Sequence, residues 1–150
     1  MAETQNGQSA EHLTIPSDST IEGLFQDGVT VENGVRAEIT GGIVGLIALR
    51  EGSRLTIHGQ AVGQLQIDVG AELTLVGLYA GTLAQSFDGA LFASQGSTIN
   101  RRVLLDGRFE EQQSGVEVLT DSTRLFRLTR ADGSLATEEF AIRTSRLKFE

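Results

Sequence analysis

The apolar positions of residues 29–83 recur with a period of 18 residues, and polar residues and glycines fill the positions between them. Val31, Leu49 and Ile67, for example, stand at equivalent places in three successive copies. Self-similarity at a fixed short period is the signature of a solenoid, because a single copy cannot bury its apolar face without its neighbours. The pattern therefore predicts that the chain is organised around a stack of similar coils.

Three columns of glycine run through the same copies in register. A helix would lose about 1 kcal/mol at each internal glycine, whereas a corner between strands often needs the positive φ that glycine adopts easily. Stretches such as residues 55–58 alternate apolar and polar residues, which is typical of a half-buried strand. We therefore predict triangular coils of three short strands, stacked in parallel about 4.8 Å apart. The predicted corner glycines are Gly34, Gly41, Gly45, Gly52, Gly59, Gly63, Gly70, Gly77 and Gly81.

Toward the N-terminus the pattern weakens and then ends. Residues 11–28 form a degenerate copy, in which Leu13 matches Val31. An atypical terminal copy is expected of a solenoid, because its outer side has no neighbour. Residues 1–11 are almost entirely polar, so we predict a disordered tail there.

Toward the C-terminus the repeat decays and is replaced by another pattern. Residues 84–115 continue it loosely at an offset of 19, with a further turn at Asp106-Gly107, and we predict a solenoid of about five rungs over residues 12–115. Residues 116–150 contain one glycine and alternate apolar with charged residues. We predict an antiparallel segment there, which packs on the solenoid and has a hairpin turn at residues 130–133. Its predicted strands are 116–119, 125–129, 135–142 and 147–149.

Charge and composition limit the possible partners and compartments. The net charge of −8 disfavours binding to nucleic-acid phosphates. Residues 1–100 hold 11 acids and 3 bases, and residues 101–150 hold 9 of each, so the acidity belongs to the first two-thirds. The chain has no cysteine, no apolar leader and no run of 18 apolar residues. We therefore expect a cytoplasmic protein without a membrane span.

Residues suited to catalysis are few. His58 lies on a predicted strand beside the inward Ile57, so it should point outward, and its column neighbours Thr40 and Val76 offer no acid. The two histidines stand far apart and cysteine is absent, so no zinc site is expected. No P-loop or nucleophile-elbow motif occurs. The sequence therefore predicts a protein that is not an enzyme, with no catalytic residues, no metal and no cofactor.

One side of the predicted solenoid carries almost no charge. Residues 39–49, 59–67 and 73–87 contain no charged residue, and they come into register in successive coils. A flat, uncharged and partly apolar surface is a candidate for protein interaction; cover by the C-terminal segment is the alternative. The candidate residues of this interaction face are Leu24, Leu46, Gln60, Gln64, Leu78 and Tyr79.

The repeat resembles that of the bactofilins, the bacterial polymer-forming cytoskeletal proteins. Residues 55–65 and 70–75 carry the resemblance, through their order of strand, glycine, two or three residues, glycine and strand. The resemblance covers about residues 12–110. It implies a right-handed β-helix that polymerises end to end without nucleotide.

A left-handed hexapeptide β-helix also has 18 residues per coil, so the handedness is open between the two. Such helices carry an inward aliphatic residue at every sixth position. They often belong to acyltransferases, which need a well-placed catalytic histidine, and this chain lacks one. The matching series here is Val31, Ala37, Ile43, Leu49, Leu55, Ala61, Ile67 and Leu73.

Two functions fit these observations. The first is a bactofilin-like scaffold or interaction protein that acts through its solenoid ends and its uncharged face. The alternative is an acidic immunity protein that binds and blocks a bacterial toxin, because acidic inhibitors suit basic partners. The expected partner is thus a protein, either a second copy or a basic toxin. Because the C-terminal segment should cover one end, we expect a monomer or dimer and not a filament.

Overall fold

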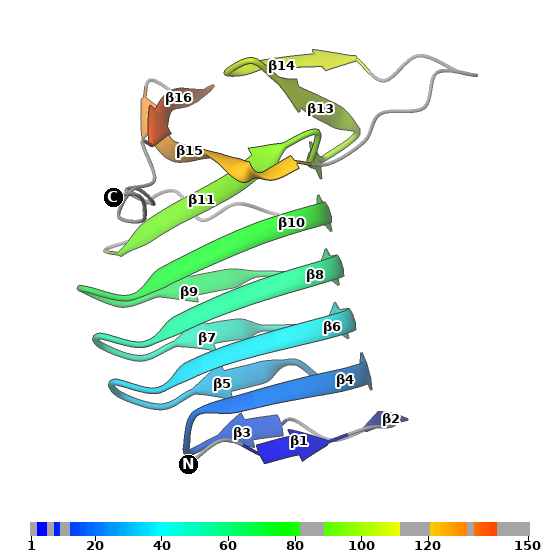
Figure 1. Ribbon diagram of the computed structural model, residues 1–150, viewed down its shortest axis with the longest axis vertical. Coiled ribbons are helices and arrows are strands. Elements are labelled where there is room, and N and C mark those ends of the chain that lie inside the picture. The colour runs from blue at the N-terminus through cyan, green and yellow to red at the C-terminus, as the bar shows by residue number, and fades with distance from the viewer. Residues whose placement is uncertain are drawn as a thin grey trace, which may run out of the picture.

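The computed structural model describes residues 3–5, 8–9, 13–81, 89–111, 121–131 and 134–140 (Figure 1). Within these ranges the chain forms strands and turns, and none of the described residues is helical. Parallel strands stack along the long axis in about four turns, and antiparallel strands cover one end. The predicted all-β fold, a parallel β-solenoid with an antiparallel C-terminal part, is therefore confirmed. The strands predicted at 116–119 and 147–149 lie outside the described residues.

Each coil is built from one long strand and one short strand. The long strands lie side by side in one sheet, and the short strands form a second sheet of four. The long strands are β4 (Ser19–Phe25), β6 (Arg36–Val44), β8 (Arg54–Val62) and β10 (Glu72–Ala80). The short strands are β3 (Leu13–Ile15), β5 (Val29–Val31), β7 (Ile47–Leu49) and β9 (Leu65–Ile67).

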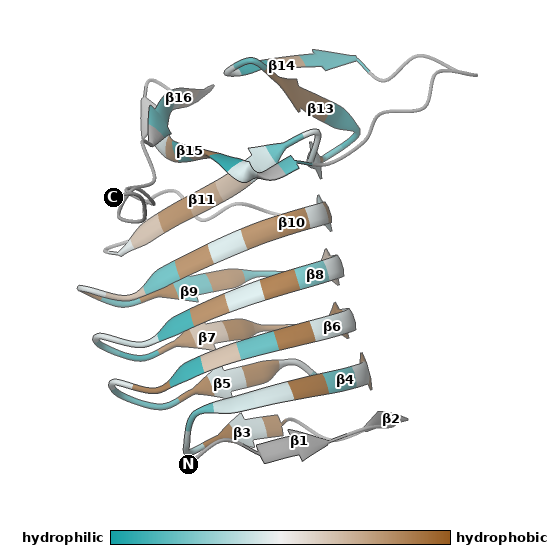
Figure 2. Cartoon of the chain, viewed as in Figure 1, coloured by the Kyte–Doolittle hydropathy of each residue, from teal (hydrophilic) through white to brown (hydrophobic). Residues whose placement is uncertain are grey.

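The burial pattern places a corner inside each long strand. In β6, Ala37 and Ile39 are buried, residues 40–42 are not, and Ile43 is buried again. Three consecutive outward residues break the alternation of a strand, so the strand turns at its central glycine and covers two sides of the coil. The same bands of hydrophobic and hydrophilic residues recur in β8 and β10 (Figure 2).

The solenoid core is the series of aliphatic residues at every sixth position. From β6 to β8 and from β8 to β10 the strands pair at an offset of 18 residues, so equivalent side chains stack on one another. All eight residues of the predicted inward series are at most 4% exposed. Burial of an aliphatic side chain of this size contributes roughly 1.5–3 kcal/mol. The stack therefore supplies most of the apolar burial of the described chain.

The nine predicted corner glycines all have positive φ, but they fall into two classes. At Gly34, Gly52 and Gly70, φ lies between 71° and 76°, and an added Cβ atom would meet no atom nearer than 3.7 Å. At the other six, a Cβ would lie within 2.9 Å of the backbone of the preceding coil. At Gly59 it would lie 2.0 Å from the carbonyl oxygen of Gly41. These six glycines are therefore required by close stacking as well as by φ.

The first corner of the solenoid is shorter than the pattern predicted. Leu13 pairs with Val29, and not with Val31. The long strands β4 and β6 keep the offset of 18, so the difference arises in the corner at residues 16–18. The carboxylate of Asp18 in this corner accepts a hydrogen bond from a backbone N–H of the next coil at 2.9 Å. A side chain thus occupies a position that a longer corner would give to backbone.

The N-terminal residues extend the large sheet by short strands. β1 (Glu3–Gln5) and β2 (Gln8–Ser9) both pair in parallel with β4. The structure differs here from the expected disordered tail over residues 1–11, whose other members lie outside the described residues. Backbone pairing needs no apolar side chain, so these strands leave no trace in the hydropathy pattern.

The stack continues above β10 with two short strands. β11 (Ala90–Gln95) pairs with β10 at an offset of 18, and β12 (Thr98–Ile99) pairs with it at an offset of 20. The two extra residues are Gly96 and Ser97, which separate the strands. The single offset of 19 that the sequence predicted is thus an average of two real ones.

Beyond β12 the chain leaves the solenoid. β13 (Arg102–Leu105) runs antiparallel to β12, and β14 (Arg108–Glu111) runs antiparallel to β13. The predicted turn at Asp106-Gly107 joins the last two strands, with φ of 50° and 83°. Parallel stacking therefore ends at β12, and the residues after it do not form the further rung that was predicted up to residue 115.

The side chain of Asn100 takes the place of backbone where the stack stops. Its amide donates to the carbonyl oxygen of Gly81 at 3.0 Å and accepts from the Gly81 N–H at 2.8 Å. In the coil below, the Gly63 N–H bonds the carbonyl of Ala80. Asn100 therefore supplies a donor and an acceptor at a corner that has no further coil above it.

Asn100→Asp is expected to lower the free energy of unfolding by about 1–2 kcal/mol, because the carboxylate cannot donate to the Gly81 carbonyl. Asparagine and aspartate both tolerate the φ of 49° found at this position. The measurement is the urea midpoint. Asn33→Asp makes the same change at an exposed corner residue with no described side-chain hydrogen bond, and it should leave the midpoint unchanged. Equal midpoints for the two variants would contradict the role of Asn100.

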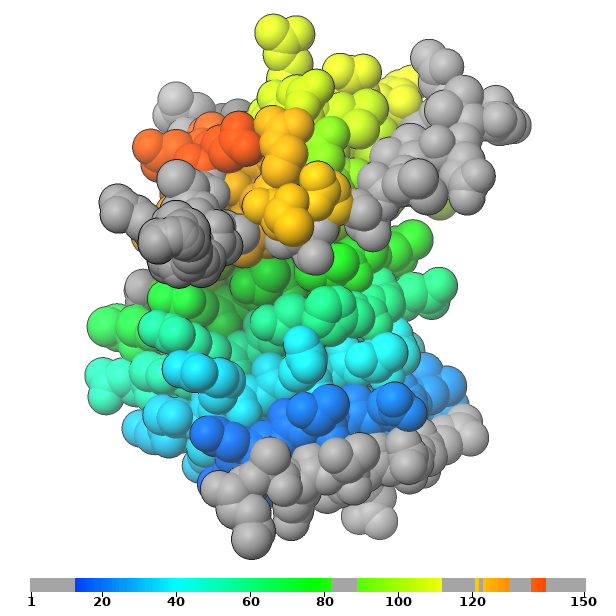
Figure 3. Space-filling model, viewed as in Figure 1, coloured from blue at the N-terminus to red at the C-terminus, as the bar shows by residue number. Residues whose placement is uncertain are grey.

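The C-terminal hairpin closes the upper end of the large sheet. β15 (Asp121–Ala131) pairs antiparallel with β11, and β16 (Ser134–Phe140) pairs with β15; we call these two strands the cap. Phe126 and Leu128 of the cap lie opposite Ala93 and Leu91 and are 2% and 1% exposed. The cap sits directly over the coils in the space-filling view (Figure 3). The predicted hairpin and its packing on the solenoid are both present.

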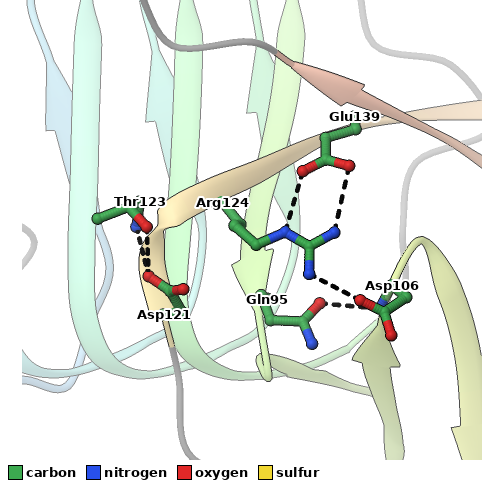
Figure 4. A network of polar contacts seen from close by, with 6 residues as sticks. All are labelled: Gln95, Asp106, Asp121, Thr123, Arg124 and Glu139. Carbon is green, nitrogen blue, oxygen red and sulfur yellow. Dashed lines mark hydrogen bonds and ion pairs between the residues drawn. The ribbon is translucent and has the colours of Figure 1, made fainter. Parts of the chain in front are cut away.

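Arg124 ties the cap to the β13–β14 turn (Figure 4). Its guanidinium donates to both carboxylate oxygens of Glu139, at 3.0 and 3.2 Å, and to the carboxylate of Asp106 at 2.7 Å. These hydrogen bonds raise the pKa of Arg124 above its ordinary value. The Asp106 N–H in turn donates to the side-chain oxygen of Gln95 at 2.8 Å. The network therefore links β11, the β13–β14 turn, β15 and β16.

Candidate interaction face

An uncharged surface follows the second half of each long strand and the corner after it. Its columns are set by the register: Leu24, Gly42, Gln60 and Leu78 stack in one, and Val44, Val62 and Ala80 in the next. We call these residues, with Leu46 and Gln64, the uncharged face. The side chains of Leu24, Val44, Leu46, Val62 and Leu78 are between 38% and 44% exposed.

Five of the six predicted face residues are at the surface. The three leucines are 38–39% exposed, and Gln60 and Gln64 are exposed. Val44 and Val62 were missed, although their column was readable from the 18-residue repeat as the second outward position after the glycine corner. Outward aliphatic residues repeated from coil to coil are thus the main chemical character of this face.

Tyr79 does not belong to the face. It is 1% exposed and stacks in the inward column above Ala61, so the prediction that placed it outward is wrong. Its hydroxyl donates to the carbonyl oxygen of Gly63 at 2.5 Å. Burial raises the pKa of Tyr79 to about 12. This side chain fills the core beside a corner and offers nothing to a partner.

The first half of each long strand presents a contrasting, charged surface. Arg54 and Glu72 approach to 3.7 Å, and His58 Nε2 lies 3.0 Å from a carboxylate oxygen of Glu38. The prediction that no acid lies beside His58 is therefore wrong, because Glu38 reaches it diagonally from the neighbouring strand. Both side chains of this pair are more than one-third exposed, so the contact contributes little to stability.

Other kinds of site are not found in the part of the chain that the structure describes. Those residues contain no cluster of three or more histidine, aspartate or glutamate side chains that could hold a metal ion. Nor do they contain a helix long and apolar enough to cross a membrane. Comparison of the sequence and structure with protein-family models, with curated proteins and with solved structures gave no match.

Proposed function

We propose that this protein is a non-enzymatic interaction protein that binds a partner protein through the uncharged face. The observation that carries the proposal is the gathering of five half-exposed aliphatic side chains on a surface without charge, in a chain of net charge −8. Covering such side chains contributes roughly 25 cal/mol for each Å² of apolar surface. The rigid stack holds them in fixed columns, so little side-chain ordering is needed on binding.

The arrangement of the two ends supports a discrete protein over a head-to-tail filament. A filament would continue the parallel stack from the last coil of one copy to the first coil of the next. Here β15 pairs antiparallel with β11 and takes that place in the large sheet. The bactofilin-like proposal is therefore kept for the coil architecture and for scaffolding through a face, and end-to-end polymerisation is not part of it.

An acidic inhibitor of a basic toxin is the second candidate. It is favoured by the charge of residues 1–100, which hold 11 acids and 3 bases. Such a partner would bind the charged strand halves, and its binding would weaken steeply with salt. A partner of the uncharged face would bind with little dependence on salt. The salt dependence of a purified complex therefore separates the two candidates.

Val62→Lys should weaken capture of the partner from native cell lysate at least tenfold, because it places a charge at the centre of the uncharged face. Thr40→Lys adds the same side chain at an exposed position of the charged surface and should leave capture unchanged. The measurement is quantitative mass spectrometry of proteins retained by the tagged wild-type chain and by each variant. Retention of the same proteins by Val62→Lys and wild type would contradict the proposal.

A further inference from the structure

β16 is the one long edge strand in the described part of the chain. Five other strands there also have a partner on one side only, namely β1, β2, β3, β9 and β14, and each has between two and four residues. β16 has seven residues, and it pairs with β15 over seven positions without a register shift. Proteins protect their edges by keeping them short or by bulging them. β16 has neither protection.

The charges on β16 are already engaged within the chain. Charged side chains commonly guard an edge against pairing. Glu139, however, is held by the guanidinium of Arg124 through two hydrogen bonds. Glu138 lies opposite Arg127 on β15. The two carboxylates therefore repel an incoming strand less than their number suggests.

The charge distribution of the chain selects the partner for this edge. Residues 101–150 are neutral, with nine acids and nine bases, whereas residues 1–100 have an excess of eight acids, 11 minus 3. Two copies that meet at the cap keep their acidic coils apart, beyond the Debye length of about 8 Å at physiological salt. We infer that β16 pairs antiparallel with β16 of a second copy, so that two large sheets join across a two-fold axis.

The length and register of β16 place the axis at Thr137. Only an axis at this central residue pairs all seven positions of both strands. In a two-residue hairpin the closing pair, Ala131 and Ser134, is hydrogen-bonded, and the pairs then alternate. The backbone groups of Thr137 accordingly face the open edge, as the axis requires, and about six hydrogen bonds can form between the copies.

The same register gives the interface a readable charge pattern. Glu138 of one copy faces Ala136 of the other, in a non-hydrogen-bonded pair whose side chains lie close together. Both side chains are exposed in the single chain. No carboxylate then faces a carboxylate across the axis. The dimer uses no residue of the uncharged face, so it goes beyond the proposed function and does not depend on it.

The test is sedimentation velocity of the full chain over a wide concentration range. A shift from 16.0 kDa toward twice that mass is expected as concentration rises. Ala136→Glu places a carboxylate opposite Glu138 at two symmetric points and should raise the dimer dissociation constant at least tenfold. Ala136→Lys alters the same exposed position with the opposite sign, and it should keep or strengthen the dimer.

Circular dichroism melting of both variants shows whether the fold is retained, which an exposed position predicts. A chain that stays monomeric at every concentration overturns the inference. So does a dimer that Ala136→Glu leaves intact, and a dimer that Val62→Lys dissociates would assign self-association to the uncharged face. Equal weakening by the glutamate and lysine variants would also overturn it, because the register requires opposite effects.

Discussion

Gly59→Ala is expected to lower the free energy of unfolding by about 3–5 kcal/mol. The new Cβ would stand 2.0 Å from the carbonyl oxygen of Gly41, and that atom belongs to the backbone of a stacked coil. Neither coil can move without breaking the register with the next one. The backbone φ of 143° adds strain for any residue with a side chain. The measurement is equilibrium unfolding in urea, or the melting temperature.

Gly52→Ala is the matched control for this prediction. Gly52 also has positive φ, at 74°, but an added Cβ would meet no atom nearer than 3.9 Å. We expect a loss of only about 1–2 kcal/mol, which is the cost of the left-handed conformation alone. If the two variants melt at the same temperature, close stacking of the coils does not limit the residue at Gly59.

Phe126→Ala should cost about 3–5 kcal/mol, because it empties the contact through which the cap covers the last coil. Phe126 is 2% exposed and lies opposite Ala93 of β11. A loosened cap also uncovers the edge of β11, and exposed edges pair with other chains. We therefore expect a lower melting temperature together with light scattering that rises with protein concentration.

Thr129→Ala tests whether this effect belongs to the buried side of β15. Thr129 lies on the same strand with its side chain exposed, so its removal should change stability by no more than about 0.5 kcal/mol. Scattering that rises equally in both variants would mean that the cap does not protect the edge of β11.

The period of 18 residues was enough to predict the coils, their parallel stacking and their inward residues. Series such as Leu55, Ala61 and Ile67 are buried as the pattern required. The hairpins at the C-terminal end were also readable, because an Asp-Gly turn between apolar strands has few other solutions. These features depend on local sequence and on repetition, both of which a single sequence displays directly.

The features that were missed depend on contacts between copies that are not alike. Leu13 was placed one strand position too far, because the shortened corner at residues 16–18 removes two residues and the period cannot detect a deletion. Glu38 was not expected beside His58, since a diagonal contact between strands depends on side-chain reach. Tyr79 was placed outward because its aromatic ring suggested an interface, although its column held Phe25, Ile43 and Ala61.

The separation of identical inner coils from specialised ends has a consequence for the length of the molecule. β6, β8 and β10 pair at one offset, so a whole 18-residue unit can be added or removed between them without changing what Asn100 or the cap contacts. Each unit would move the two ends apart by about 4.8 Å, the spacing of paired strands. The coils thus act as a ruler, whose graduation is fixed by backbone hydrogen bonding and whose total span is set by the number of sequence duplications.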